Sequence, residues 1–172
     1  MSFIGKEYHL YTLPFDYVVV ASSKPLDPDP EVFYIDRLQE SDLEFIQSNQ
    51  TVAYSPEYIL LLINQQPFSQ MNCCIRSIAT KEPVSLALSH LDMSIGLITT
   101  SPRYRNQGFA SFCLLQVCRL QRKFLLGQSQ QIRDYYAFVA FDNAQSTKLL
   151  TRNGFSRSDL NSYFWGRVDG HH

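Results

Sequence analysis

Several features are scarce in this 172-residue sequence, and each scarcity excludes a class of protein. The formal net charge is −1, so the basic excess that a broad nucleic-acid surface needs is missing. No apolar run reaches the ~20 residues that a membrane-spanning helix requires. The start, MSFIGKEYHLYTLPFDY, has neither the pattern of a signal peptide nor that of an Arg-rich transit peptide. We expect a cytoplasmic protein, with the mitochondrion as the alternative, and neither nucleic acid nor membrane as a partner.

Metal and phosphate-loop motifs are also missing. The four cysteines, Cys73, Cys74, Cys113 and Cys118, form no CxxC pair and have no histidine cluster near them in the sequence. We interpret them as reduced core residues and expect no metal. Neither GxxxxGK[ST] nor GxGxxG occurs, so the Walker-type loop and the dinucleotide fingerprint are both excluded.

The composition that remains is that of an ordinary globular domain. The sequence is 45% hydrophobic and 18% charged, and its length fits one domain. The segment SSKPLDPDPE (22–31) has three prolines and predicts a loop. We therefore divide the chain into an N-terminal arm (1–30), a domain (31–168) and a tail (169–172).

Hydrophobic periodicity and capping patterns predict the elements of that domain. Ser41 with Glu44 forms a candidate capping box, and Ser55 precedes Pro56 as a helix start. Segment 93–141 is a strand–helix–strand unit, which joins parallel strands. The apolar run 135–141 predicts a strand buried on both faces of a mixed sheet with helices on both sides. The expected strands are 31–38, 72–79, 83–91, 93–100, 135–141 and 162–168, and the expected helices are 41–49, 55–66, 106–126 and 143–152.

The stretch TSPRYRNQGFASF (99–111) carries the chemistry. It joins a strand to the longest helix, whose first backbone N–H groups have no partner within the helix and attract anions such as phosphate. Gly108 would let a ligand approach the main chain, Ala110 keeps the wall low, and Arg105 can add charged hydrogen bonds. The alternative is that Gly108 only allows the helix to pack closely on the sheet.

The wider pattern resembles the acyl-CoA-binding motif of the GNAT N-acyltransferase superfamily. The matching residues are Pro102, Tyr104, Arg105, Gly108 and Ala110, and DNAQSTKLLTRNGF (142–155) is similar to the family's second element. The resemblance implies an α/β (α+β) GNAT fold: a mixed, mostly antiparallel sheet with a central splayed parallel strand pair and flanking helices. Within the superfamily, SPEYILLLINQQPFSQMNCCI and EPVSLALSHLDMSIGLITTSPRYRNQG resemble the C-terminal domain of the glycine N-acyltransferase group. We expect that group's N-terminal half to be missing from this chain.

The resemblance also implies a binding mode and cofactor residues. In the family, the strand before the loop carries a bulge, and the pantetheine arm of an acyl-CoA lies along its exposed main chain. Gly96 suggests such a bulge or a close approach, or simply weak packing. Asn143 can also be an ordinary helix cap. The expected cofactor-binding residues, for acetyl-CoA or another acyl-CoA, are Leu97, Ile98, Thr99, Thr100, Arg105, Asn106, Gln107, Gly108, Phe109, Ala110, Asn143 and Ser146.

The implied reaction is direct attack of an amine on the thioester in a ternary complex, with no covalent acyl-enzyme. Ser94 stands where the glycine acyltransferases have a glutamate, and it cannot act as a base at neutral pH. Asp92, otherwise a turn residue, and His90, otherwise a surface histidine, are the other catalytic candidates. Leu150 replaces a tyrosine general acid of other family members. An acceptor carboxylate would require a cation, and Arg76, Arg103 and Arg167 are candidates.

Three functions follow from the sequence. The first is acyl-CoA-dependent N-acylation of a small amine or an amino acid such as glycine. The second is a catalytically degenerate module that binds CoA or a protein partner, and the third is a protein-directed acetyltransferase. The exposed edges expected of such a sheet allow a monomer or a homodimer.

Overall fold

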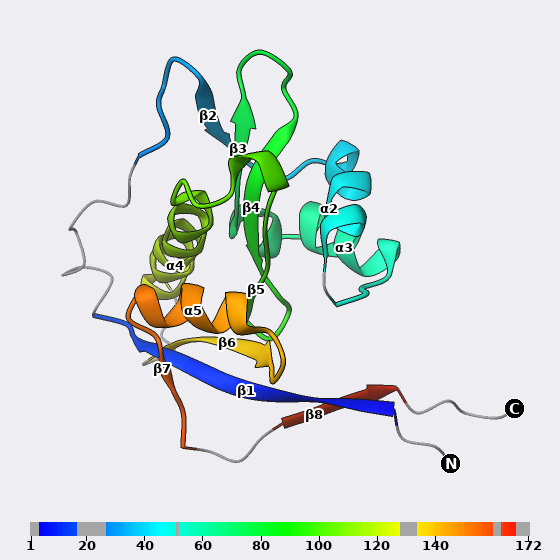
Figure 1. Ribbon diagram of the computed structural model, residues 1–172, viewed down its shortest axis with the longest axis vertical. Helices are drawn as coiled ribbons and strands as arrows, with labels where there is room; N and C mark the ends of the chain where they lie inside the picture. Colours follow the sequence, from blue (N-terminus) through cyan, green and yellow to red (C-terminus); the bar gives the residue numbers. More distant parts are fainter. Residues whose placement is uncertain (1–3, 17–26, 51, 128–133, 160–162, 168–172) are drawn as a thin grey trace, which may run out of the picture.

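The computed structural model describes residues 4–16, 27–50, 52–127, 134–159 and 163–167 (Figure 1). The described strands are β1 (Ile4–Pro14), β2 (Phe33–Asp36), β3 (Asn72–Ser77), β4 (Pro83–Ser89), β5 (Ile95–Thr100), β6 (Asp134–Ala140), β7 (Ser156–Arg157) and β8 (Tyr163–Arg167). The described α-helices are α2 (Leu43–Asn49), α3 (Pro56–Asn64), α4 (Phe109–Leu126) and α5 (Ala144–Arg152). Single 3-10 turns cover Glu40–Asp42, Phe68–Gln70 and Pro102–Tyr104.

The strands form two four-stranded antiparallel sheets. One has the order β2-β3-β4-β5, and in the other β1 pairs with β6, β7 and β8. Strands β5 and β6, which α4 connects, belong to different sheets. Their N-terminal ends nevertheless meet, because the Tyr136 hydroxyl at the start of β6 donates to the main-chain oxygen of Asp92, just before β5. The pair predicted to be parallel and splayed is thus in contact at one end and unpaired beyond it in the described residues.

The N-terminal residues form part of the second sheet. The segment predicted as an arm contains β1, which pairs with β6 from Tyr8 opposite Ala140 to Pro14 opposite Asp134. The side chains of Tyr11 and Leu13 are buried in the core. The stretch YVVVA (17–21) of the same segment lies outside the described residues.

Two hydrophobic clusters lie on opposite faces of the β2–β5 sheet. On one face α4 packs against β3, β4 and β5, while α2 and α3 cover the other face (Figure 1). Alternation along β3 sends Cys73 and Ile75 to the α4 side and Cys74 to the α2–α3 side. In the described part of the chain, no helix is long and apolar enough to cross a membrane.

Strand β6 is buried on one face only, which corrects the prediction. Tyr135, Ala137 and Val139 are buried in the core, whereas Tyr136 and Phe138 are half-exposed on the opposite face. The prediction failed because tyrosine and phenylalanine count as apolar in the sequence pattern but can also lie on a partly open face. The open face of β6 carries Tyr136, which contacts the turn before β5.

Local capping explains most helix boundaries. Ser55 caps α3, its hydroxyl accepting from the Tyr58 N–H, and Pro56 occupies the first turn as predicted. Gly154 follows α5 with φ 87°, the left-handed conformation that commonly ends a helix. The predicted capping box of Ser41 and Glu44 is wrong, because α2 begins later, at Leu43, after a 3-10 turn.

Candidate active site

Strand β5 carries a bulge at its centre. Leu88 pairs with Gly96 and Leu86 with Thr99, so Leu97 and Ile98 together face a single residue of β4. Leu97 has φ 48°, the left-handed conformation typical of strained or bulged backbone. Because β5 is also the last strand in its sheet, its other edge presents main-chain groups that no described strand uses.

The start of α4 presents backbone donors at the end of the same strand. Gly108 is the N-cap with φ 83°, and Asn106 has φ 63°. Within the described part of the chain, no acceptor is found for the amides of Phe109, Ala110 and Ser111. The left-handed Gly108 accounts for this glycine in a way that close helix packing alone does not.

The side chains around this turn differ in their exposure to solvent. Arg105, Asn106, Gln107 and Gly108 are exposed, and Arg105 Nε lies 3.4 Å from the Thr100 carbonyl oxygen. Phe109, by contrast, is buried against Phe33 at a ring distance of 4.9 Å. Phe109 can therefore contribute only its amide to a ligand.

Asn143 and Ser146 lie together at the start of α5. The Asn143 side-chain oxygen accepts from the Ser146 N–H at 3.0 Å, so Asn143 is the N-cap. The capping role, which the sequence left as an alternative, is therefore present. It leaves the Asn143 amide nitrogen and the Ser146 hydroxyl without a partner among the described residues.

His90 is a core residue, not a surface histidine as its alternative interpretation held. It is buried, and its Nδ1 lies 3.0 Å from the Tyr58 hydroxyl. Its ring stacks on Tyr58 at 5.9 Å and lies tilted against Tyr54 at 5.1 Å. Burial lowers the pKa of His90 to about 4, and the charge of Asp92 acts in the opposite direction. The imidazole is thus neutral and weakly basic at neutral pH.

Gly96 is required by this histidine. A Cβ atom built on Gly96 would lie 2.3 Å from His90 Nε2, which is an overlap. The sequence suggested either a bulge or a close approach at Gly96, and the structure shows both: the bulge begins one residue later, and the imidazole lies against the glycine. His90 therefore sits directly beside the deformed part of β5.

Asp92 and Ser94 form a hydrogen-bonded pair before β5. One carboxylate oxygen of Asp92 accepts from the Ser94 hydroxyl at 2.6 Å and from the Ser94 N–H at 2.9 Å. Ser94 is buried, whereas Asp92 is exposed. Ser94 thus orients a carboxylate that solvent and a substrate can reach.

Of the three arginines suggested for an acceptor carboxylate, the two with described side chains, Arg76 and Arg103, are engaged with other groups. Arg76 is buried and donates to Asp36 at 2.7 Å and to both oxygens of Asp42 at 2.6 and 2.7 Å. The hydrogen bonds to Asp42 raise the pKa of the Arg76 guanidinium. Arg103 is exposed and stacks over the Tyr104 ring at 4.6 Å. The side chain of Arg167 lies outside the described residues, as do those of Tyr163, Phe164 and Trp165, expected to shape the acceptor pocket.

The cysteines behave as predicted. Cys73, Cys74, Cys113 and Cys118 are all free and buried, and burial raises the pKa of Cys118 well above its usual value. In the described residues no group of histidine, cysteine and acidic side chains is arranged to hold a metal ion.

Sequence reasoning missed Tyr54, Tyr58 and Tyr136. They come from the segment before α3, from α3 itself and from β6, and they meet His90 and Asp92 only in the folded chain. Their residue type carries no spacing signal, because tyrosine is common in core and surface alike. We call Tyr54, Tyr58, His90, Asp92 and Tyr136 the aromatic–acidic cluster.

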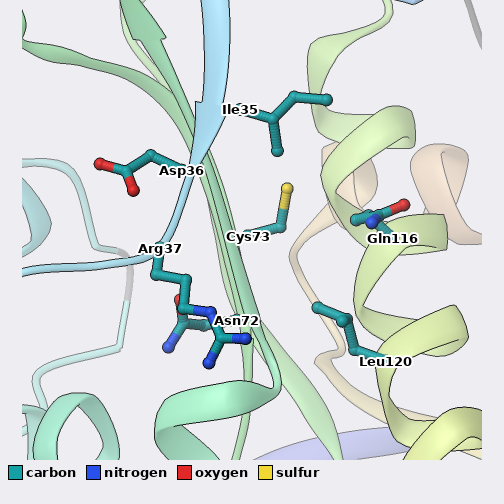
Figure 2. Close-up of a pocket in the computed structure, with 7 residues that line it drawn as sticks. All are labelled: Ile35, Asp36, Arg37, Asn72, Cys73, Gln116 and Leu120. Atoms are coloured by element: carbon teal, nitrogen blue, oxygen red, sulfur yellow. The ribbon is translucent and has the colours of Figure 1, made fainter.

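A separate open pocket of about 370 Å³ lies between β2, β3 and the side of α4. Figure 2 shows Ile35, Cys73 and Leu120 directed into it, with Asn72, Arg37, Asp36 and Gln116 around its edge. Gln116 is about two helical turns from Phe109, so this pocket is distinct from the start of α4.

The fold is shared with known acetyltransferases. The structure superposes on a Drosophila protein with a TM-score of 0.72 at 18% identity, over 98% of this chain and 52% of that chain. A GCN5-related N-acetyltransferase from Sphaerobacter thermophilus gives 0.64 at 14% identity, over 91% and 50%. A GCN5-related N-acetyltransferase from Kribbella flavida gives 0.52 at 14% identity, over 99% and 61%. The chain therefore has the GCN5-related N-acetyltransferase fold, which confirms the predicted fold class.

These likenesses have defined limits. No family model matches the sequence, and no curated protein matches it. The chain spans about half the length of the first two solved chains. At such identities the likeness establishes the fold, and the resemblance to the glycine N-acyltransferase group stays a prediction from the sequence.

Proposed function

We propose that this chain is an acyl-CoA-dependent N-acyltransferase. The observation that carries the proposal is the continuous path along β5: a bulged strand with a free edge leads, through Thr100, to a left-handed glycine and the unpaired amides of α4. An extended arm with a diphosphate at one end matches such a path, because the strand edge offers main-chain partners and the helix start favours the anion.

The cofactor residues follow from this path. The pantetheine arm lies along Leu97, Ile98, Thr99 and Thr100. The diphosphate meets the amides of residues 105–110, with Arg105 adding a charged contact. At ~3.3 Å per residue, β5 spans about 13 Å from Thr100 to Gly96, so the thiol end of the arm lies near the bulge and His90. Asn143 and Ser146 approach the arm from the start of α5.

The chemistry requires a proton acceptor and an oxyanion donor. Asp92 is the best placed base, because its carboxylate is exposed and fixed by Ser94. Ser94 has an orienting role, and His90, neutral and buried, shapes the pocket beside the reacting carbon. A main-chain N–H of the bulged segment donates to the oxyanion. Transfer is direct, because the four cysteines are buried and none is placed to attack a thioester.

The remaining details extend the same proposal. The acyl group is acetyl or longer, and the acceptor is the amine of a small molecule or of an amino acid such as glycine. We place the protein in the cytoplasm, with the mitochondrion as the alternative, as a monomer or homodimer. The acyltransferase domain covers residues 31–168, together with β1.

One observation favours a second candidate, a module that binds CoA without turnover. Ser94 replaces the glutamate of the glycine acyltransferases, and Leu150, where other family members have a tyrosine acid, is buried. Turnover then depends on Asp92. An Asp92→Asn variant that retains thiol release from acyl-CoA with amines would contradict this role.

Binding and turnover are tested separately. Ligand at ~100 times its dissociation constant adds roughly 2.7 kcal/mol of stability, so acetyl-CoA, longer acyl-CoAs and free CoA should each raise the melting temperature if they bind. Gly108→Glu places a carboxylate at the expected diphosphate position and should abolish the shift. The matched control is Gly127→Glu, the same substitution at the other end of α4, which should retain it. A shift that survives Gly108→Glu would overturn the proposal, and free-thiol release with an amine panel then separates the enzyme from the CoA-binding module.

A further inference from the structure

The aromatic–acidic cluster lies beside the start of β5, where the proposed acyl-CoA path ends. Its histidine packs against Gly96, one residue before the bulge, and Tyr136 reaches it from β6, the neighbouring strand. The acceptor nitrogen has to come close to the thioester carbon, which the proposed path of the arm places at this end of β5. The side chains around the cluster therefore decide what kind of amine is accepted.

The cluster has one charged group, and that charge is negative. Tyr54 and Tyr58 stack at 5.5 Å, and the His90 ring stacks on Tyr58 and lies tilted against Tyr54. The charge of Asp92 acts on all three side chains. Burial is the largest cause that raises the pKa values of Tyr54, Tyr58 and Tyr136, and the charge of Asp92 raises each of them further. The tyrosines and His90 are thus neutral at pH 7, which leaves the Asp92 carboxylate as the charge that an acceptor meets.

Three described cations, Arg76, Arg103 and Lys81, are engaged with other groups. Arg76 is neutralised by Asp36 and Asp42, and Arg103 lies over Tyr104 after β5. Lys81 lies over the Tyr34 ring, at the β3–β4 turn. A carboxylate on the acceptor would therefore meet Asp92 without a compensating cation from these groups.

We infer that the acceptor is a cationic primary amine without a carboxylate, held by Asp92 and the faces of Tyr54 and Tyr58; this inference rests on the proposed function. A carboxylate and aromatic faces are the groups that recognise an ammonium ion in a partly dry site. An amino acid such as glycine, the acceptor suggested by the sequence resemblance, would instead be repelled through its carboxylate.

The same arrangement fits the reaction. The ammonium proton passes to Asp92 and from there to water, and the free amine attacks the thioester carbon. The C–S bond breaks as the C–N bond forms, and the second amine proton goes to the departing CoA thiolate. The products are a neutral amide, CoA thiol and one proton. Because the amide is uncharged, it loses the attraction to Asp92 and can leave.

The test uses matched acceptor pairs on the protein saturated with CoA. Phenethylamine and phenylalanine, and methylamine and glycine, differ only by a carboxylate. Titration calorimetry of each with the CoA-loaded protein, and thiol release with acetyl-CoA, should favour the amine of each pair by at least about tenfold. Equal or better binding of the amino acid, or no binding of any amine to the CoA-loaded protein, would overturn the inference.

Variants of the cluster make the test specific. Asp92→Asn keeps an acceptor oxygen for Ser94 but removes the charge. It should weaken amine binding roughly five- to tenfold. It should also reduce the ratio of amine affinity to amino-acid affinity. Tyr54→Leu should weaken amine binding roughly two- to fivefold, and Tyr54→Phe, which keeps the ring, should restore it. The CoA-induced melting shift should be intact in all three. Amine binding unchanged in both Asp92→Asn and Tyr54→Leu would overturn the inference.

The outcomes separate the two proposals. A preference for amino acids with CoA binding intact contradicts only the acceptor class. Failure of acyl-CoA and CoA to bind contradicts the proposed function, and the acceptor inference falls with it.

Discussion

At the scale of single residues, His90 is a titratable group held neutral by burial. Its pKa falls to about 4, against 6.5 for an exposed histidine. Between these values the unfolded chain binds the proton and the folded chain does not. Folding stability should therefore fall as the pH drops from 6.5 to 4, by about 3 kcal/mol from this side chain.

The prediction is checked by urea unfolding at pH 7 and pH 4. His90→Asn removes the titrating group while keeping a polar atom near the Tyr58 hydroxyl. The variant should lose about 3 kcal/mol less than the wild type on acidification, since the other titrating groups are unchanged. An equal loss in both proteins would show that His90 is protonated in the folded state.

At the scale of elements, β5 packs against the turn before it at Gly96, where the absence of a side chain leaves room for His90. Gly96→Ala should destabilise the fold by about 1–3 kcal/mol, because its Cβ would overlap His90 Nε2 and the rings of Tyr54 and Tyr58 limit how far the imidazole can move. His90→Ala should relieve most of this cost. A double-mutant cycle by urea unfolding measures the coupling, which should exceed about 1 kcal/mol. Additive effects would mean that the two residues do not restrain one another.

The elements that sequence could predict are those with local causes. Ser55 with Pro56 fixes the start of α3, and Gly154 ends α5, because capping and backbone conformation depend on a few neighbouring residues. Gly108 belongs to this group: the predicted role required an accessible main chain at the helix start, and its left-handed conformation supplies it. The domain from residue 31 onward has the predicted order of elements for the same reason, except that the short strand β7 is added between α5 and β8.

What the sequence could not give depends on contacts between distant segments. The sequence offers a surface position for His90 as the alternative to a catalytic role, yet Tyr54 and Tyr58 from another part of the chain enclose it. Ser41 has the pattern of a helix cap, but α2 begins at Leu43 instead. The residue before this start, Asp42, forms a buried ion pair with Arg76. Tertiary contacts override local preference at both places.

At the scale of the whole molecule, the chain consists of two antiparallel sheets whose neighbouring strands, β5 and β6, meet at one end (Figure 1). The proposed acyl-CoA path and the aromatic–acidic cluster both lie at this junction. The sheet that contains β6 is organised around β1, because β1 pairs with each of the other three strands. The position of β6, and with it Tyr136, therefore depends on the N-terminal segment.

This dependence predicts that β1 is structurally essential. Leu13 is fully buried in the core, so Leu13→Ala should lower the free energy of unfolding by about 2–5 kcal/mol, as large-to-small core substitutions do. The matched control is Leu10→Ala on the same strand, where the half-buried side chain should cost roughly 1 kcal/mol. Urea unfolding followed by circular dichroism measures both. Equal and small losses at Leu13 and Leu10 would mean that β1 contributes little to the core, as expected of the N-terminal arm that the sequence predicts. The strand β6 would then hold its place beside β5 without β1.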